Sequence, residues 1–252
     1  MPSTHAIPGA FRAPSFALLA TEPLRALFDH LAAHVAAPPT PIGDGHPVIV
    51  YPGLGAGNFN TSTLRNFLKQ SGYTAYDWER GVNTGPDGVF DDWLCHLDDR
   101  VRQLHRVHER KVSLLGWSLG GVYAREIAKR CPEAVRQVIT LGTPFAALAH
   151  GNHAGTIFKL LNGERAHLPP ELEARLREAP PVPTTSIYSK NDGIVCWRGC
   201  VQRRSALAES IEVEASHLGM ISHPQVLRLV ASRLSQPEGA WRPHRRPRSA
   251  SL

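Results

Sequence analysis

Cysteine is scarce in this chain, whose 252 residues include only four. So few thiols exclude a disulfide-rich framework, and no second cysteine pair or matched histidine pair accompanies Cys196 and Cys200 to make a zinc site. The spacing of these two residues is still compatible with a local disulfide, which a reducing cytoplasm would oppose. Cys95 and Cys131 fall in helical patterns, where we expect buried thiols. We therefore expect no structural metal.

Long apolar runs are also missing. No stretch of 18 apolar residues occurs, so the sequence predicts no transmembrane helix. The first 20 residues hold short apolar patches broken by Pro8 and Pro14, without a basic start before a continuous apolar core. This pattern is unlike a signal peptide, and a cytoplasmic location is the expectation.

Acidic residues are outnumbered, and the formal net charge is +6. Residues 236–252 contribute +3 of it, because they hold four arginines and one glutamate: Arg242, Arg245, Arg246, Arg248 and Glu238. We expect this segment to be a disordered basic tail. It is compatible with a weak membrane-surface contact. No recognition-helix, zinc-finger or aromatic RNA-binding pattern accompanies it, so no nucleic-acid partner is expected.

What the chain does have is an alternation of apolar strands and amphipathic helices, which predicts an α/β domain with a mostly parallel sheet flanked by helices. We place this domain at residues 46–235, after an N-terminal extension at 1–45 that contains a helix. The expected strands are 48–51, 73–78, 112–115, 135–141, 184–188 and 210–214. The clearest expected helices are 22–36, 61–70, 90–108 and 224–234.

The most informative motif is Gly116-Trp-Ser-Leu-Gly-Gly121, which follows a buried strand and leads into a helical stripe. It predicts a nucleophile elbow, a sharp strand-to-helix turn with Ser118 at its tip. Such a turn crowds the residues two before and two after the serine, so that only small side chains fit at Gly116 and Gly120.

A serine hydroxyl needs a histidine base and an acid that orients it. Asp192 lies in a turn after one expected strand and His217 in a loop after the next, which gives the chain order Ser, Asp, His. We assign these three residues as the catalytic triad, which needs no metal or organic cofactor. The alternatives are His223 as the base, and Glu212 or Glu214 as the acid.

An oxyanion hole is predicted where the strand ending at Tyr51 runs into the glycine-rich turn Pro52-Gly-Leu-Gly55. Glycines let a backbone N–H approach a developing negative charge closely. By position, the N–H groups of Leu54 and Leu119 are the expected donors.

Taken together, these motifs resemble the α/β-hydrolases of the bacterial lipase and esterase type. The matching segments span about residues 46–235: Pro52-Gly-Leu-Gly55, Gly116-Trp-Ser-Leu-Gly-Gly121, Leu141-Gly-Thr-Pro144, Asn191-Asp-Gly193 and Ser216-His217. The chain departs from the common His-Gly form of the first motif, with Tyr51-Pro52 before Gly53. The resemblance implies an α/β-hydrolase fold and a small-molecule ester or lipid substrate.

In hydrolases of this type the segment after the fourth expected strand often forms a lid, so residues 145–180 are a candidate short cap or lid insertion. Its apolar residues Phe145, Ile157, Phe158 and Leu161 are the predicted substrate-binding residues. The alternative is a peripheral helix pair docked on the sheet.

The sequence thus predicts a serine hydrolase that cleaves carboxylic esters through an acyl-enzyme. One alternative is an acyltransferase that uses the same triad with an alcohol or amine acceptor. The other is a non-catalytic ligand-binding protein on a hydrolase scaffold.

Overall fold

A single six-stranded parallel sheet forms the centre of the protein in our computed structural model, which describes residues 11–35, 43–148 and 170–244. The strand order is β2-β1-β3-β4-β5-β6, and every neighbouring pair is parallel. The predicted parallel α/β fold is therefore confirmed. The strands are β1 (Pro47–Tyr51), β2 (Thr74–Asp77), β3 (Val112–Trp117), β4 (Val135–Leu141), β5 (Thr184–Ser189) and β6 (Ala208–Val213).

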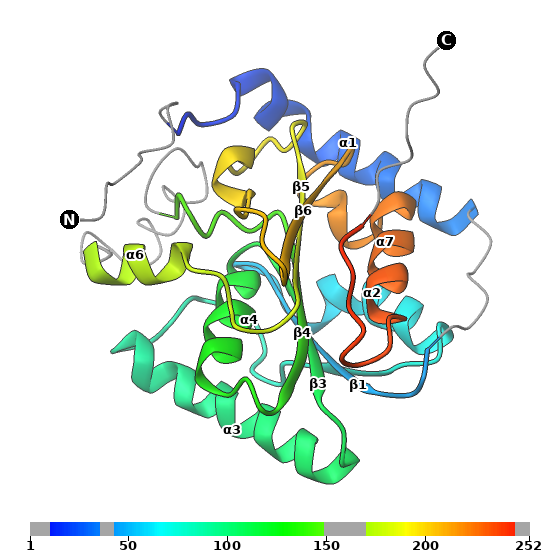
Figure 1. Ribbon diagram of the computed structural model, residues 1–252. Helices are drawn as coiled ribbons and strands as arrows, with labels where there is room; N and C mark the ends of the chain where they lie inside the picture. Colours follow the sequence, from blue (N-terminus) through cyan, green and yellow to red (C-terminus); the bar gives the residue numbers. More distant parts are fainter. Residues whose placement is uncertain (1–10, 36–42, 149–169, 245–252) are drawn as a thin grey trace.

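Helices cover both faces of the sheet (Figure 1). Two hydrophobic cores follow from the alternation of side chains along each strand: Ile49 and Leu114 belong to one, Val48 and Leu115 to the other. Helices α3 and α4 pack on the first core, and α2 and α7 on the second. The helices are α1 (Phe16–Val35), α2 (Asn58–Gln70), α3 (Phe90–His108), α4 (Leu119–Arg130), α6 (Pro170–Arg177) and α7 (Pro224–Leu234), with 3-10 turns η1 (Trp197–Cys200) and η2 (Gly219–Ile221).

The first helix begins earlier than expected, at Phe16 and not Glu22. Pro23 suggests a helix start beside it, because proline is favoured in the first turn. Ser15 provides the cap instead: its side-chain oxygen accepts from the Leu18 N–H at 3.3 Å. The helix therefore runs through Pro23.

The cysteines and the helices bear on three further predictions from the sequence. Cys95 is exposed on α3, so the prediction of a buried thiol was wrong there, whereas Cys131 is buried. Cys196 and Cys200, both of which the structure describes, are not joined by a disulfide. No helix in the described ranges is both long and apolar enough to cross a membrane.

The first part of the predicted basic tail, residues 236–244, is described and bonds back to the domain. The Gln236 side chain accepts from the Arg242 N–H at 2.6 Å, and the Gln236 carbonyl accepts from Arg136 at 2.6 Å. The His244 N–H donates to Glu209 on β6. This part differs from the expected disordered tail because it bonds to Glu209 and Arg136 of the domain as well as within itself. Residues 245–252 lie outside the described residues.

A buried polar cluster lies at the end of the sheet where the strands begin, opposite the turns that follow the strands. The His46 ring is fully buried, contacts the Asp44 carboxylate through Nδ1 and lies 2.8 Å from Ser113 Oγ through Nε2. Burial lowers the pKa of His46 from 6.5 to about 4, against the opposing effect of Asp44 and with added repulsion from Arg136. His46 is therefore neutral at physiological pH.

This lowered pKa predicts acid sensitivity. Between pH 6.5 and about 4 the unfolded chain binds a proton at His46 that the folded protein does not, so stability falls as the pH falls through this window. We expect a loss on the order of 3 kcal/mol from this group. Urea unfolding of wild type and His46→Gln at pH 7 and pH 4 measures it, because groups that do not contact His46 cancel in the comparison; Asp44, whose pKa His46 helps to lower, is the exception. An equal loss in both proteins would contradict the assignment.

Candidate active site

Ser118 sits in the sharp turn between β3 and α4, with φ 54° and ψ −123°. A non-glycine residue rarely adopts this conformation, and its presence at a strand-to-helix turn is the geometry expected of a nucleophile elbow. The flanking glycines are required sterically. A Cβ at Gly116 would lie 2.4 Å from the Gly120 carbonyl oxygen, and one at Gly120 would lie 2.3 Å from the Tyr51 carbonyl oxygen.

The predicted base and acid are in direct contact. His217 Nδ1 lies 2.6 Å from Asp192 Oδ2, and both side chains are buried. The other carboxylate oxygen, Oδ1, accepts from the N–H groups of Ile194 and Val195 at 2.8 Å each. Because the carboxylate accepts the Nδ1 proton, Nε2 of His217 is left as the proton acceptor.

The electrostatics of the pair favour a basic imidazole. Burial opposes the charged form of His217, but the negative charge and hydrogen bond of Asp192, with a further contribution from Glu22, raise its pKa above the usual value. An imidazole with a raised pKa in a buried site is suited to accept a proton from a hydroxyl group.

Two contacts connect Ser118 to the histidine loop. Trp117, the residue before Ser118, donates from its indole Nε1 to the His217 carbonyl oxygen at 3.0 Å. The Ser118 N–H donates to the Leu141 carbonyl at 2.8 Å, and Gly142 follows at once. A Cβ at Gly142 would lie 3.0 Å from His217 Nδ1 and 3.2 Å from Asp192 Oδ2. The elbow therefore lies against the loops that carry Asp192 and His217, where β3, β4, β5 and β6 end, and the triad itself stays a prediction.

The glycine-rich turn after β1 lies against the elbow. A Cβ at Gly53 would be 3.1 Å from the Ser118 Cβ. Leu54, the first predicted oxyanion donor, follows Gly53 in this turn. Leu119, the second, is the first residue of α4, where an N–H has no carbonyl partner within the helix. Both predicted donors thus belong to segments that touch Ser118, although their role stays a prediction.

Asn83, which the sequence analysis missed, organises this turn. Its side-chain Nδ2 donates to the Pro52 carbonyl at 2.8 Å, and its backbone bonds to Gly55 at 2.7 Å and Ala56 at 2.8 Å. Tyr123 donates to its Oδ1 at 3.1 Å. Asn83 is fully buried and lies in a loop without apolar periodicity, so no local pattern distinguishes it from an ordinary turn asparagine.

Removing the Asn83 side chain should therefore disturb the glycine-rich turn of the predicted oxyanion hole without touching Ser118. We expect Asn83→Ala to lower kcat by about 10- to 100-fold, with a smaller change in KM. This decrease in kcat is no larger than the decrease typical of losing one oxyanion donor. Steady-state kinetics on a p-nitrophenyl ester, with thermal unfolding to verify the fold, measure this. Wild-type kcat in a folded variant would show that the turn does not depend on Asn83.

The alternative base and acids are occupied elsewhere. His223 is the N-cap of α7 and accepts from the Gln225 N–H, and its Nε2 lies 3.8 Å from Asp29. Glu212 pairs with Lys190 at 3.0 Å, and Glu214 is exposed. These positions favour His217 and Asp192.

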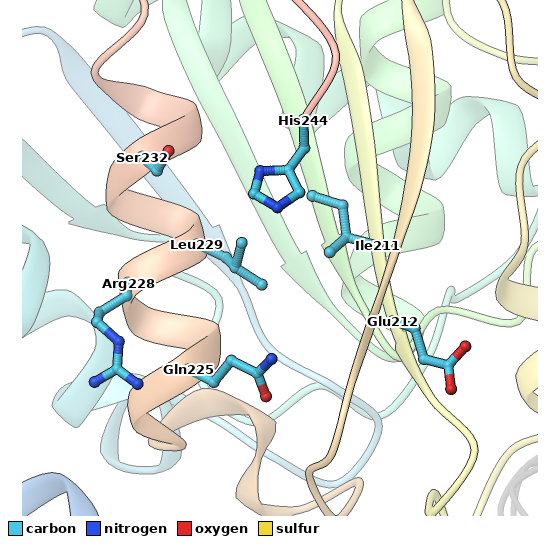
Figure 2. Close-up of a pocket in the computed structure, with 7 residues that line it drawn as sticks. All are labelled: Ile211, Glu212, Gln225, Arg228, Leu229, Ser232 and His244. Atoms are coloured by element: carbon cyan, nitrogen blue, oxygen red, sulfur yellow. The ribbon is translucent and has the colours of Figure 1, made fainter. Parts of the chain in front are cut away.

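A hollow of about 350 Å³ lies between β6 and α7, away from the triad residues, none of which lines it (Figure 2). Its lining includes Glu212 from the strand, Arg228 from the helix and His244 from the segment after α7. In the described part of the chain, no group of three or more His, Cys, Asp or Glu side chains could hold a metal ion.

Of the predicted substrate-binding residues, only Phe145 lies within the described ranges. It is buried, with the Arg125 guanidinium 3.7 Å from its ring centroid, so the arginine covers one face of the ring. Ile157, Phe158 and Leu161, with most of the predicted cap, lie outside the described residues.

The parallel sheet, the strained serine turn and the Asp–His pair at the ends of the strands define the protein as an α/β-hydrolase. Comparison with known proteins makes the class more specific, because the family model described as palmitoyl protein thioesterase matches residues 47–209. The chain belongs to this family, which confirms the resemblance to lipase- and esterase-like α/β-hydrolases.

Individual relatives agree with this class. The chain is similar to the serine hydrolase BPHL of Mus musculus, with 30% identity over 108 residues that make up 40% of this chain and 37% of the relative. It is also similar to a pimeloyl-[acyl-carrier protein] methyl ester esterase of Shewanella woodyi, with 30% identity over 40% of this chain and 38% of the relative. The matches thus span less than two fifths of these curated relatives.

Among solved structures, the mature form of the Bacillus licheniformis lipase BlEst2 superimposes with a TM-score of 0.58 at 19% identity, over 78% of this chain and 94% of the lipase. At this identity the likeness concerns the fold. The fold of this chain is thus that of a lipase-like α/β-hydrolase.

Proposed function

We propose that this protein is a serine hydrolase that cleaves carboxylic esters or thioesters of acyl chains through an acyl-enzyme on Ser118. The observation that carries the proposal is the buried contact of 2.6 Å between Asp192 and His217 beside a serine held at φ 54°. A neutral imidazole oriented in this way leaves one ring nitrogen available to deprotonate a hydroxyl.

The reaction follows from these roles. His217 Nε2 takes the Ser118 proton as Ser118 Oγ bonds to the substrate carbonyl carbon, and the Leu54 and Leu119 N–H groups stabilise the oxyanion. The intermediate collapses with cleavage of the bond to the alcohol or thiol, which leaves with the proton from His217. Water then gives a proton to His217 and attacks the acyl-enzyme, which releases the acid and regenerates Ser118.

The substrate class is supported by the family description. It names a thioesterase acting on palmitoyl protein, whereas one relative is named a methyl ester esterase. Both reactions cleave an acyl group from a heteroatom, and the same three side chains serve either. We therefore propose an acyl ester or thioester as the substrate, with an aliphatic acyl chain.

The test is a matched series of substrates. p-Nitrophenyl esters with acyl chains from two to sixteen carbons are compared with acyl thioesters of the same lengths, the latter followed by thiol release. We expect turnover in at least one series, with kcat/KM increasing with acyl-chain length up to the length that the active site accommodates. Folded wild-type protein that turns over neither series would overturn the proposal and favour the ligand-binding alternative.

A further inference from the structure

Helix α1, which the sequence analysis placed in an N-terminal extension, lies beside η2 and α7 along the top of the molecule (Figure 1). Its outward residues are apolar, and Leu24, Leu27 and Phe28 are more than half exposed. Its charged residues face the protein instead. Glu22 is only 2% exposed, an unusual position for a carboxylate unless it is paired.

Glu22 joins the two loops that carry the acid and the base. Its Oε2 accepts from the Gly193 N–H at 3.0 Å, and its Oε1 accepts from the Leu218 N–H at 2.9 Å. Gly193 directly follows Asp192, and Leu218 directly follows His217. One buried carboxylate therefore bridges the residues next to both members of the pair.

The other sides of the acid and the base are held by the same helix. Arg25 bonds Glu22 at 2.6 Å, and its Nη1 donates to the carbonyl of Asn191, the residue before Asp192. Asp29 Oδ2 accepts from the N–H of Ser216 at 3.0 Å and from its hydroxyl at 2.6 Å. Ser216 is the residue before His217.

The chain is shaped for this close approach. A Cβ at Gly193 would lie 2.6 Å from Glu22 Oε2 and 2.5 Å from the Leu18 carbonyl oxygen, and one at Gly219 would lie 2.0 Å from Asp29 Oδ2. Glycine is therefore the residue that fits at each of the two contacts. Both loops thus have small residues where α1 touches them.

We propose that Glu22 is a positioning residue, whose buried carboxylate clamps the Asp192 loop to the His217 loop and makes α1 an integral part of the active site. The inference rests on the proposed function. The carboxylate is also a second negative charge near the imidazole, and it acts with Asp192 to raise the pKa of His217. Loss of Glu22 should therefore change both the geometry and the titration of the base.

Three variants separate these two effects. Glu22→Gln places an amide NH₂ against a backbone N–H donor and removes the charge. Glu22→Asp keeps the charge but is one methylene too short to reach both N–H groups. Glu22→Ala removes both the charge and the two hydrogen bonds. The matched control is Glu109→Gln, because Glu109 is exposed directly after α3, at the end of the sheet where β3 begins.

For Glu22→Gln we expect kcat to fall about 10- to 100-fold with KM changed less than about threefold. The acidic limb of the kcat/KM pH profile should move to lower pH, because removal of a negative charge lowers the pKa of His217. Glu22→Asp should restore the acidic limb toward wild type while kcat stays reduced. Glu109→Gln should match wild type in both.

Each outcome is decisive. A purely structural Glu22 would lower thermal stability without moving the pH profile, and wild-type kcat and pH profile in folded Glu22→Gln would overturn the clamp. If Glu22→Gln does not fold, Glu22→Asp alone decides, because wild-type kcat in this variant would overturn the two-sided bridge. If wild-type protein neither turns over esters nor is labelled by a fluorophosphonate, the proposed function is wrong. That result differs from failure of the clamp, in which wild type is active and Glu22→Gln is equally active.

Discussion

Ser118→Ala is expected to lower kcat for any substrate of this protein by at least about 10⁴-fold, while the fold remains intact. Ser118 occupies a turn at φ 54° that is maintained by the close backbone packing of Gly116 and Gly120 and by the Thr143 hydroxyl, which donates to the Ser118 carbonyl at 2.9 Å. None of these contacts involves the hydroxyl of Ser118. Steady-state kinetics with thermal unfolding of the same sample measure the effect.

The matched control is Ser232→Ala, on α7 and away from the triad. It should retain wild-type kcat. Residual activity in Ser118→Ala within tenfold of wild type, in protein freed of contaminating hydrolases, would mean that another group is the nucleophile.

Asp192→Asn should lower kcat at neutral pH by about 10³- to 10⁴-fold. The reason is specific to this site. Oδ1 accepts from the N–H groups of Ile194 and Val195, so an asparagine must keep its oxygen there and turn its NH₂ toward His217 Nδ1. That nitrogen would then be an acceptor, and the proton would sit on Nε2, where it blocks removal of the Ser118 proton.

The pH dependence of kcat separates this explanation from simple loss of folding, and Glu212→Gln is the control for the alternative acid. Because Glu212 pairs with Lys190, Glu212→Gln should leave kcat within about twofold of wild type. A large loss in Glu212→Gln with normal activity in Asp192→Asn would reverse the assignment of the acid.

Much of the fold could be predicted because the evidence is local. The buried strand Pro47–Tyr51 is a continuous apolar segment, and α3 occupies the range expected from its amphipathic spacing. The position of Ser118 could also be predicted locally, because the glycines that its turn requires, Gly116 and Gly120, lie within two residues of it.

The supporting residues could not be predicted for the opposite reason. Glu22 contacts Gly193 and Leu218 across 171 and 196 positions of the chain, and a carboxylate on an amphipathic helix gives no sign of its partner. Asn83 looks like any turn asparagine until the fold brings Pro52 and Tyr123 to it. Trp117 is separated by 100 residues from His217, and its hydrogen bond to the His217 carbonyl is visible only in the structure.

The central claim, that Ser118 is the nucleophile of an acyl-transfer reaction, is tested most directly by intact-mass spectrometry after reaction with a fluorophosphonate. We predict one adduct on wild type, located at Ser118 by peptide mapping, none on Ser118→Ala, and much slower labelling of His217→Ala. No adduct on folded wild-type protein, or an equal adduct on Ser118→Ala, would contradict the account.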